Sequence, residues 1–409
     1  MTEQDIRRYA ELIITKGINL QKGKAVLITT GAGTYYFARA LGKAAYRLGA
    51  SYVQILTDDL DLLSSRLEAQ SEEEVQFVPA YLKALDYEFI SEGWSSIRID
   101  STEERLDHGP LDPEKNRLAS AARRKASEAR SRVLMRHQLP WCVCVAPGPL
   151  WAKQVLGEDA KPEDLFEVLK PILLLDREDP GTAWDEKHET LQKRMDFINA
   201  LDFKALHFQS PRTDLTIGFR KEARFVGGAE TLPSGKRFFA NLPTEEIFST
   251  PDRMQVEGYV TTTRPVEVLN TPTEEVRLVF KEGKVVEHSA KKGQEVLDRF
   301  FEIDEGARRI GEVALVDESS PIAQSGLIFH SILLDENASC HLALGEGYPI
   351  CLEHGSTLSN EEELHEAGCN TSLVHVDFMV GSSDMNVDAI LSDGSRVPII
   401  VDGRFSLNH

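Results

Sequence analysis

The chain has few cysteines, and none of them lies in a C-x-x-C pair. They are Cys142, Cys144, Cys340, Cys351 and Cys369. An odd number without paired spacing argues against a disulfide framework and fits a reducing compartment. We therefore expect a cytoplasmic protein whose cysteines are small buried residues.

Positive charge is also scarce, and long apolar runs are absent. Lysine and arginine number 46 against 66 aspartates and glutamates, which gives a formal charge of −20 over 409 residues. Such a surface repels phosphate backbones and anionic lipids. No stretch approaches the ~20 apolar residues of a membrane span, and the polar N-terminus lacks a signal-peptide pattern. We expect neither nucleic acid nor a membrane as a partner.

Several familiar motifs are missing as well. There is no G-x-S-x-G, which argues against a serine hydrolase. H-E-x-x-H is absent, since His365 in HEAGC lacks a second histidine. The glycine-containing segment 29–36 lacks the full G-x-G-x-x-G and the Walker lysine, so it predicts a plain turn from strand to helix rather than a phosphate loop.

The length allows two domains, each with its own core. In the N-terminal half, predicted helices alternate with predicted strands, which is typical of βαβ units and a parallel sheet. The helices are expected at 5–16, 35–48, 71–85 and 113–136, and the strands at 25–30, 51–56, 95–100 and 141–145. Short strand-like runs dominate beyond Pro211. We predict an α/β N-terminal domain with a mainly parallel sheet and a helical connector (1–205), and an α+β, β-rich second domain (206–409).

The most informative residues are a histidine and an aspartate two positions apart in the run 372–379, SLVHVDFM. The run has the composition of a buried strand, and the two-residue period of a strand puts the side chains of His375 and Asp377 on one face. Two adjacent donors on a rigid strand suit a metal ion. A structural hydrogen bond or part of a catalytic triad would use the same pair.

Three further donors lie in otherwise apolar segments: Glu246 in NLPTEEIF, Glu312 in GEVALV and His341 in CHLALGEGYP. Each has another interpretation, with Glu246 at a helix start, Glu312 in an ion pair and His341 as a hydrogen-bonded core residue. Burying this many carboxylates and imidazoles without a cation is unfavourable, however. Together the candidates predict a metal centre.

Three carboxylates and two imidazoles are more than an open catalytic zinc site needs, since such a site has three protein ligands. They are about right for two ions that share a bridging carboxylate. Two cations ~3.5–4 Å apart hold a bridging hydroxide, polarise a carbonyl and bind a free amino group, which suits amide hydrolysis at a peptide N-terminus. Mixed nitrogen and oxygen donors accept zinc, cobalt, manganese or magnesium.

The sequences of these motifs and their order along the chain resemble those of the thermophilic-type metalloaminopeptidases, the family of aminopeptidase T and aminopeptidase S. The resemblance spans nearly the whole chain, and its most specific segments are NLPTEE and HVDFM. It implies that the same five residues hold two cocatalytic divalent metal ions, and that Tyr348 of GEGYP lies beside them as a hydrogen-bonding catalytic group. It also implies a homodimer that encloses the active site, which would restrict substrates to short peptides.

Two questions of chemistry stay open at this point. Either Glu246 or Glu312 is the general base that takes a proton from the metal-activated water and passes it to the leaving amine. The alternative function is a mononuclear iron ring-cleaving dioxygenase with His341, His375 and Asp377 as a facial triad, in which one iron would not need both glutamates. A catalytically silent scaffold is disfavoured because every ligand position holds a competent residue.

Overall fold

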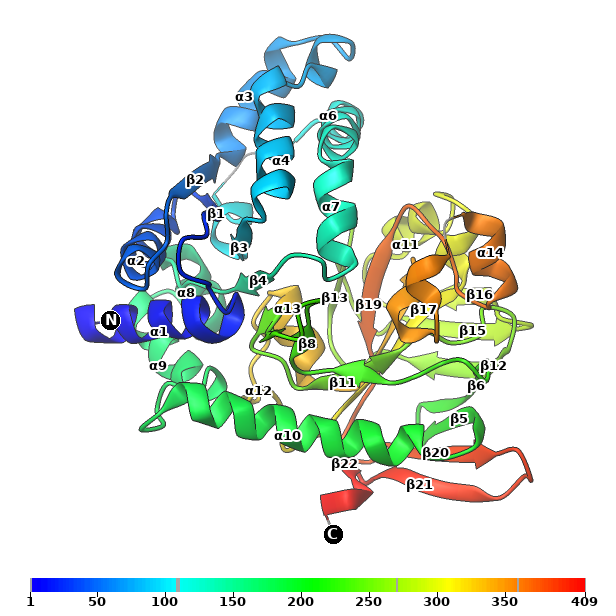
Figure 1. Ribbon diagram of the computed structural model, residues 1–409. Coiled ribbons are helices and arrows are strands. Elements are labelled where there is room, and N and C mark those ends of the chain that lie inside the picture. The colour runs from blue at the N-terminus through cyan, green and yellow to red at the C-terminus, as the bar shows by residue number, and fades with distance from the viewer. Residues whose placement is uncertain (1, 108–110, 270, 359, 409) are drawn as a thin grey trace. The chain divides into compact units, whose positions relative to one another are not determined.

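The computed structural model describes residues 2–107, 111–269, 271–358 and 360–408 (Figure 1). Its contacts divide the chain into two compact units, Met1–Glu186 with Ala229–Pro243 and Lys187–Gly228 with Thr244–His409. The division falls inside helix α10 (Pro180–Asn199). It differs from the expected boundary after residue 205, because the second half of α10 packs into the core of the second unit and residues 229–243 return to the first.

The first unit is built on a parallel sheet, as the alternating pattern predicts. The strand order is β10-β4-β3-β1-β2, and each ladder in it is parallel. The strands are β1 (Val26–Gly31), β2 (Val53–Asp58), β3 (Ser95–Ile99), β4 (Trp141–Cys144) and β10 (Asn241–Leu242). The segment that supplies β10 also forms the hairpin of β8 (Glu230–Thr231) and β9 (Arg237–Phe238).

Helices make up most of the rest of this unit (blue to green in Figure 1). They are α1 (Glu3–Leu12), α2 (Tyr35–Arg47), α3 (Leu60–Ala69), α4 (Ala80–Glu92), α5 (Thr102–Arg105), α6 (Pro113–Ala126), α7 (Glu128–Met135), α8 (Pro149–Leu156) and α9 (Pro162–Ile172). The helix predicted at 71–85 is correct only from residue 80, where α4 begins, and residues 71–79 form no α-helix. Pro79 is the N-cap of α4, and proline disfavours a helical residue before it.

The turn after β1 lies where the strand order reverses, the usual ligand site of an open α/β sheet. Here the chain's own carboxylates fill it. Glu104 Oε1 accepts hydrogen bonds from N and Oγ1 of Thr34 at 3.2 and 2.9 Å, next to the start of α2. The Glu103 carboxylate accepts from N of Leu150 and of Trp151 at 3.0 and 2.8 Å, at the start of α8. Negative groups already stabilise both helix N-termini, which agrees with a turn rather than a phosphate loop.

The second unit is mostly antiparallel. Its eight-stranded sheet has the order β16-β15-β12-β6-β5-β20-β21-β22, and its five-stranded sheet has the order β19-β18-β17-β11-β7. The strands of the larger sheet are β5 (Phe203–Ser210), β6 (Thr213–Gly218), β12 (Val256–Thr261), β15 (Arg277–Lys281), β16 (Lys284–Ser289), β20 (Asn386–Leu391), β21 (Arg396–Val401) and β22 (Arg404–Phe405). Those of the smaller sheet are β7 (Val226–Gly227), β11 (Glu246–Ser249), β17 (Ile310–Val316), β18 (His341–Gly345) and β19 (His375–Met379).

Short elements complete this unit. They are the hairpin β13 (Val266–Val268) and β14 (Thr271–Thr273), the helices α11 (Gln294–Phe300), α12 (Pro321–Ser325), α13 (Ile332–Asp335) and α14 (Glu361–Glu366), and the 3₁₀ turn η4 (Glu336–Ala338). The helix predicted at 293–301 matches α11.

The five-stranded sheet has an apolar face and a polar face, because successive side chains of a strand point in opposite directions. The apolar face joins the core of the unit, together with Leu191, Met195 and Ile198 of α10. Its members are Ile247, Val313, Leu315, Leu342, Leu344 and Phe378. The residues that alternate with them carry the candidate metal ligands.

The cysteine prediction is confirmed, since Cys142, Cys144, Cys340, Cys351 and Cys369 are all buried free thiols. Among the residues that the structure describes, no helix combines the length and apolar character needed to cross a membrane.

Candidate metal centre

The five predicted ligands lie on four neighbouring strands of the smaller sheet. Glu246 begins β11, Glu312 lies in β17, His341 begins β18, and His375 and Asp377 are both in β19. Their donor atoms form two groups, Glu246 with Glu312 and His341, and Glu312 with His375 and Asp377. Within each group the atoms lie within 4.8 Å of one another. Glu312 belongs to both groups, which is the arrangement expected of a bridging carboxylate.

The strand register explains how the side chains meet. Glu312 pairs with Ala343, and Ala343 pairs with Asp377, so the three form one row across β17, β18 and β19. In the next row, His341 pairs with Ala314. Strands two apart are separated by about 10 Å, a gap that long side chains close only if the residue between them is small. The two alanines leave that space.

A bulge in β17 sets the direction of Glu312. The register with β18 shifts between Ile310 and Glu312, at Gly311. A Cβ atom on Gly311 would lie 2.3 Å from the carbonyl oxygen of Glu346, so this close approach requires glycine. Thr250 Oγ1 donates to Gly311 O at 2.8 Å and accepts from Tyr348 N at 2.9 Å. The bulge therefore also holds the backbone of Tyr348.

Backbone carbonyls orient both imidazoles. Nδ1 of His341 donates to Ser339 O at 3.1 Å, and Nδ1 of His375 donates to Glu346 O at 2.7 Å. Each ring therefore presents Nε2 to the carboxylates, as metal-binding histidines commonly do. The Nε2 of His341 lies 3.1 Å from Glu246 Oε2, and the Nε2 of His375 lies 3.2 Å from Oε2 of Glu312.

One donor group is closed and the other is more open. Glu246, Glu312 and His341 are 6%, 5% and 1% exposed. The side chains of His375 and Asp377 are 24% and 11% exposed. The second donor group is therefore the one that solvent reaches more easily.

The cluster packs acidic carboxylates against basic imidazoles, and each group shifts the pKa of its neighbours. Burial raises the pKa of Glu312. Burial alone would lower the pKa of His341, but Glu246, Asp377 and Glu312 raise it to about 10. The pKa of His375 rises well above its usual value, because Asp377 and Glu312 outweigh the effect of burial. Without a bound cation both imidazoles are therefore protonated. Their positive charges take the place of the charge that a metal ion would supply.

The donor set fits divalent metal ions. Glu246 Oε2 is a buried carboxylate oxygen with no hydrogen-bond partner among the described residues, although Nε2 of His341 is close to it. Carboxylate oxygens and imidazole nitrogens together suit zinc, cobalt, manganese or magnesium. An unsatisfied buried acceptor is unfavourable unless a cation or a water completes it.

A fourth carboxylate, which the sequence analysis missed, lies close enough to the cluster for the charges of the cluster to act on it. Glu336 lies in η4, and its pKa is raised well above the usual value by burial and by the charges of Glu246 and Asp377. The sequence signal was the polar run DEN within ILLDENASC, five residues before His341. Nothing in the local pattern indicates that a single 3₁₀ turn brings this residue near the donor groups.

Tyr348 lies beside the donor groups, as the resemblance implies. Its ring centroid is 5.1 Å from the imidazole of His375 and 5.5 Å from the ring of Phe248. Burial, and then the charges of Glu312 and Asp377, raise the pKa of its hydroxyl well above the usual value. The hydroxyl therefore stays protonated at neutral pH and is able to donate a hydrogen bond.

Two local expectations differ from the structure. Glu246 begins a strand and not a helix, which removes the helix-start interpretation. The strand predicted at 372–379 starts only at His375. Before that point, N of Ser372 donates to Glu346 Oε2 at 2.5 Å and N of Leu373 donates to Asp304 Oδ2 at 2.7 Å, so side chains replace the ladder bonds.

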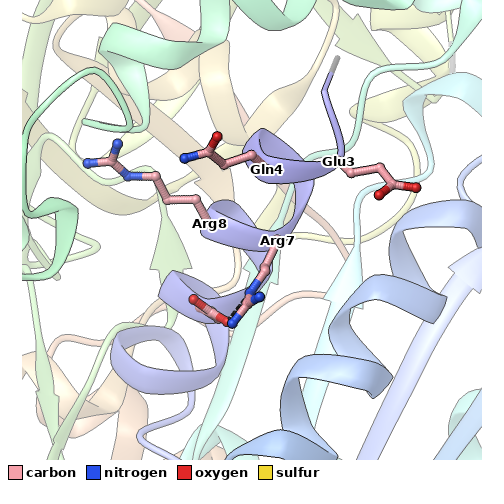
Figure 2. Close-up of a pocket in the computed structure, with 5 residues that line it drawn as sticks. Glu3, Gln4, Arg7 and Arg8 are labelled. Carbon is pink, nitrogen blue, oxygen red and sulfur yellow. Dashed lines mark hydrogen bonds and ion pairs between the residues drawn. The ribbon is translucent and has the colours of Figure 1, made fainter.

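A surface groove on the first unit offers no comparable chemistry. Figure 2 shows it along α1, where Glu3, Gln4, Arg7 and Arg8 project from the helix. Arg7 is paired with Glu11 at 2.9 Å, with side chains 63% and 38% exposed. Arg8 donates hydrogen bonds to the backbone carbonyls of Arg177 and Glu178, so both arginines of the groove already have partners.

Comparisons with known proteins cover nearly the whole chain. The model of the family described as thermophilic metalloprotease (M29) matches residues 2–405. Aminopeptidase T of Thermus thermophilus is 37% identical over 406 residues, 98% of each chain. Aminopeptidase 2 of Geobacillus stearothermophilus is 35% identical over 408 residues, 99% of this chain and 98% of the relative. The solved structure of wild-type AmpT from Thermus thermophilus superposes with a TM-score of 0.90 at 36% identity and covers 99% of both chains.

Proposed function

This chain belongs to the thermophilic metalloprotease (M29) family and is a metal-dependent aminopeptidase, and we propose that it hydrolyses N-terminal residues from short peptides at the five-residue cluster. The observation that carries the proposal is the sharing of Glu312 between two donor groups. A carboxylate between two sets of ligands is what a dinuclear hydrolase requires, because the two ions act on one substrate bond.

The charge of the cluster supports two ions. The two donor groups hold three carboxylates, those of Glu246, Glu312 and Asp377, and two imidazoles that are neutral when they bind a metal. These three negative charges exceed the charge of one divalent cation. Zinc, cobalt, manganese or magnesium, when bound, would lower the pKa of a shared water and polarise the peptide carbonyl.

The remaining steps fall to side chains of this chain. A carboxylate beside the water takes its proton and delivers it to the leaving amine. Glu336 joins Glu246 and Glu312 as a candidate for this role, because the charges of the cluster act on it although it lies outside both donor groups. The protonated hydroxyl of Tyr348 donates a hydrogen bond to the oxygen that becomes negative in the tetrahedral intermediate.

The dioxygenase alternative gains no support. The matched relatives are named aminopeptidases. Two of the residues assigned to its facial triad, His375 and Asp377, form a group with Glu312, and the third, His341, forms a second group with the same glutamate. A single iron held by a facial triad does not require a second group of donor residues.

We further propose a homodimer in the cytoplasm. The five cysteines are buried free thiols, which suits a reducing compartment. Dimerisation rests on the family resemblance and is tested by light scattering during size-exclusion chromatography, where a monomer mass at micromolar concentration would contradict it.

The central experiment combines metal analysis with peptide hydrolysis. Purified protein should contain two divalent ions per chain and release amino acids from dipeptides and short peptides. Chelation should abolish the release, and zinc or cobalt should restore it. Full activity in exhaustively dialysed, metal-free protein would overturn the proposal.

A further inference from the structure

Behind the cluster, a fully buried amide connects the elements that carry two of its carboxylates. Asn337 is 0% exposed. Its Oδ1 accepts a hydrogen bond from the backbone N of Glu245 at 2.6 Å, directly before Glu246. Its Nδ2 donates to Leu333 O at 2.9 Å and makes a longer contact of 3.4 Å with Oε1 of Glu336. One side chain thus touches the start of β11 and the turn that holds Glu336.

The orientation of this amide is fixed by chemistry. A backbone N–H requires an acceptor, and a backbone carbonyl and a carboxylate require donors. Rotating the Asn337 amide by half a turn would place its NH₂ against the N–H of Glu245 and its oxygen against Leu333 O and Glu336 Oε1. Asparagine satisfies all three partners in one orientation, and neither an aspartate nor an aliphatic residue does.

An ion pair also restrains Glu245, the residue directly before Glu246. Nζ of Lys187, on α10, lies 2.6 Å from Glu245 Oε2, and the two side chains are 22% and 4% exposed. Ser320 Oγ donates to Asn337 O at 3.0 Å. Both the backbone and the side chain of Glu245 are therefore fixed, which limits the movement of the neighbouring Glu246.

We propose that Asn337 is a positioning residue of the metal centre, which holds Glu246 through the backbone of Glu245 and holds Glu336 through its side chain. This inference rests on the proposed metal-binding function. Its physical basis is that ligands must be kept within a fraction of an ångström of their binding geometry by the groups around them. Loss of such a partner typically weakens metal binding about 10–100-fold.

The test compares Asn337→Ala with Asn199→Ala. Asn199 is a matched control, because its amide also bridges two backbone groups, N and O of Phe225, both at 2.8 Å. Zinc affinity is measured by competition with a chromophoric chelator, and melting temperature is measured with and without zinc. We expect zinc affinity to fall about 10–100-fold in Asn337→Ala and to stay unchanged in Asn199→Ala.

The melting temperatures separate positioning from simple stability. A purely structural role for Asn337 would lower the metal-free and the zinc-loaded melting temperatures equally, and would leave the zinc-induced increase intact. Positioning predicts a smaller zinc-induced increase in Asn337→Ala than in wild type. If the alanine variant does not fold, Asn337→Ser, which keeps a hydroxyl at the buried position, enters the same comparison.

Two results would overturn the inference in different ways. Zinc affinity in Asn337→Ala equal to that of wild type, or reduced no more than in Asn199→Ala, would overturn the role of Asn337 and leave the proposed function standing. Wild-type protein that binds no divalent ion would overturn the proposed function and this role together.

Discussion

Glu312 and His375 meet across the width of a whole strand, with Oε2 of the glutamate 3.2 Å from Nε2 of the histidine. Glu312 lies in β17 and His375 in β19, and β18 lies between them. The contact depends on the bulge at Gly311 and on the small side chain of Ala343 between the two strands. Glu312 is therefore the residue through which both donor groups are connected.

Replacing Glu312 by glutamine should remove both metal ions, because the neutral amide loses the charge that both groups share. We expect the metal content of Glu312→Gln to fall below one ion per chain and kcat/KM to fall more than ~100-fold, since even an outer partner of a ligand affects metal binding by about 10–100-fold. Glu287→Gln is the control, because Glu287 is exposed on β16 in the same unit. Two retained ions in Glu312→Gln would show that this carboxylate is not shared.

The positions of the candidate ligands on the strands are predictable because their signal is local. A donor isolated in an apolar run, as Glu312 is in GEVALV, is conspicuous in the sequence. The two-residue spacing of His375 and Asp377 requires only that the segment be a strand, and both lie in β19 and in one donor group. The parallel sheet of the first unit follows in the same way from alternating helical and extended patterns.

What the sequence did not predict depends on long-range contacts. Glu336 lies in a 3₁₀ turn near the cluster, and no periodicity in the sequence identifies which distant residues a turn approaches. The unit boundary lies inside a continuous helix, α10, so no turn signal marks it. The edge strand β10 joins the first sheet from a segment about a hundred residues beyond β4, a pairing that only the tertiary fold establishes.

Replacing Tyr348 by phenylalanine should slow catalysis without loss of metal. The ring packing against His375 and Phe248 is retained, and only the hydroxyl donor is removed. Loss of one oxyanion donor typically lowers kcat about 10²–10³-fold, so we expect a fall of that order in Tyr348→Phe with unchanged ion content. Tyr259→Phe, on β12, is the control. A change in KM alone would assign Tyr348 to ground-state substrate binding.

The stability of the metal-free protein should fall as the pH rises. Burial alone would lower the pKa of His341, but the neighbouring carboxylates raise it to about 10 in the folded state, above the ordinary value of 6.5. The stabilisation from the protonated imidazole is therefore complete below about pH 6.5 and is lost as the pH rises through about 10. Burial of Glu312 and Glu336, whose pKa values are also raised, acts in the same direction.

The measurement is thermal unfolding between pH 6.5 and 10, with and without zinc. Bound zinc replaces the protons on the imidazoles, so the loaded protein should show a much smaller decrease across this range. Equal decreases in the two states would mean that the imidazoles of the cluster do not exchange protons for metal.

Replacing Lys187 by methionine should destabilise the second unit, because it leaves the carboxylate of Glu245 buried without its partner. Removing one member of a fully buried ion pair costs about 3–5 kcal/mol, and partial exposure of Lys187 reduces the expected cost to about 2–3 kcal/mol. The matched control is Lys291→Met, because Lys291 forms a pair with Glu275 at 2.5 Å with side chains 71% and 46% exposed. An exposed pair contributes under about 1 kcal/mol. Urea unfolding of the metal-free variants measures both effects, and equal losses of stability would show that Glu245 is not held as a buried charge by Lys187.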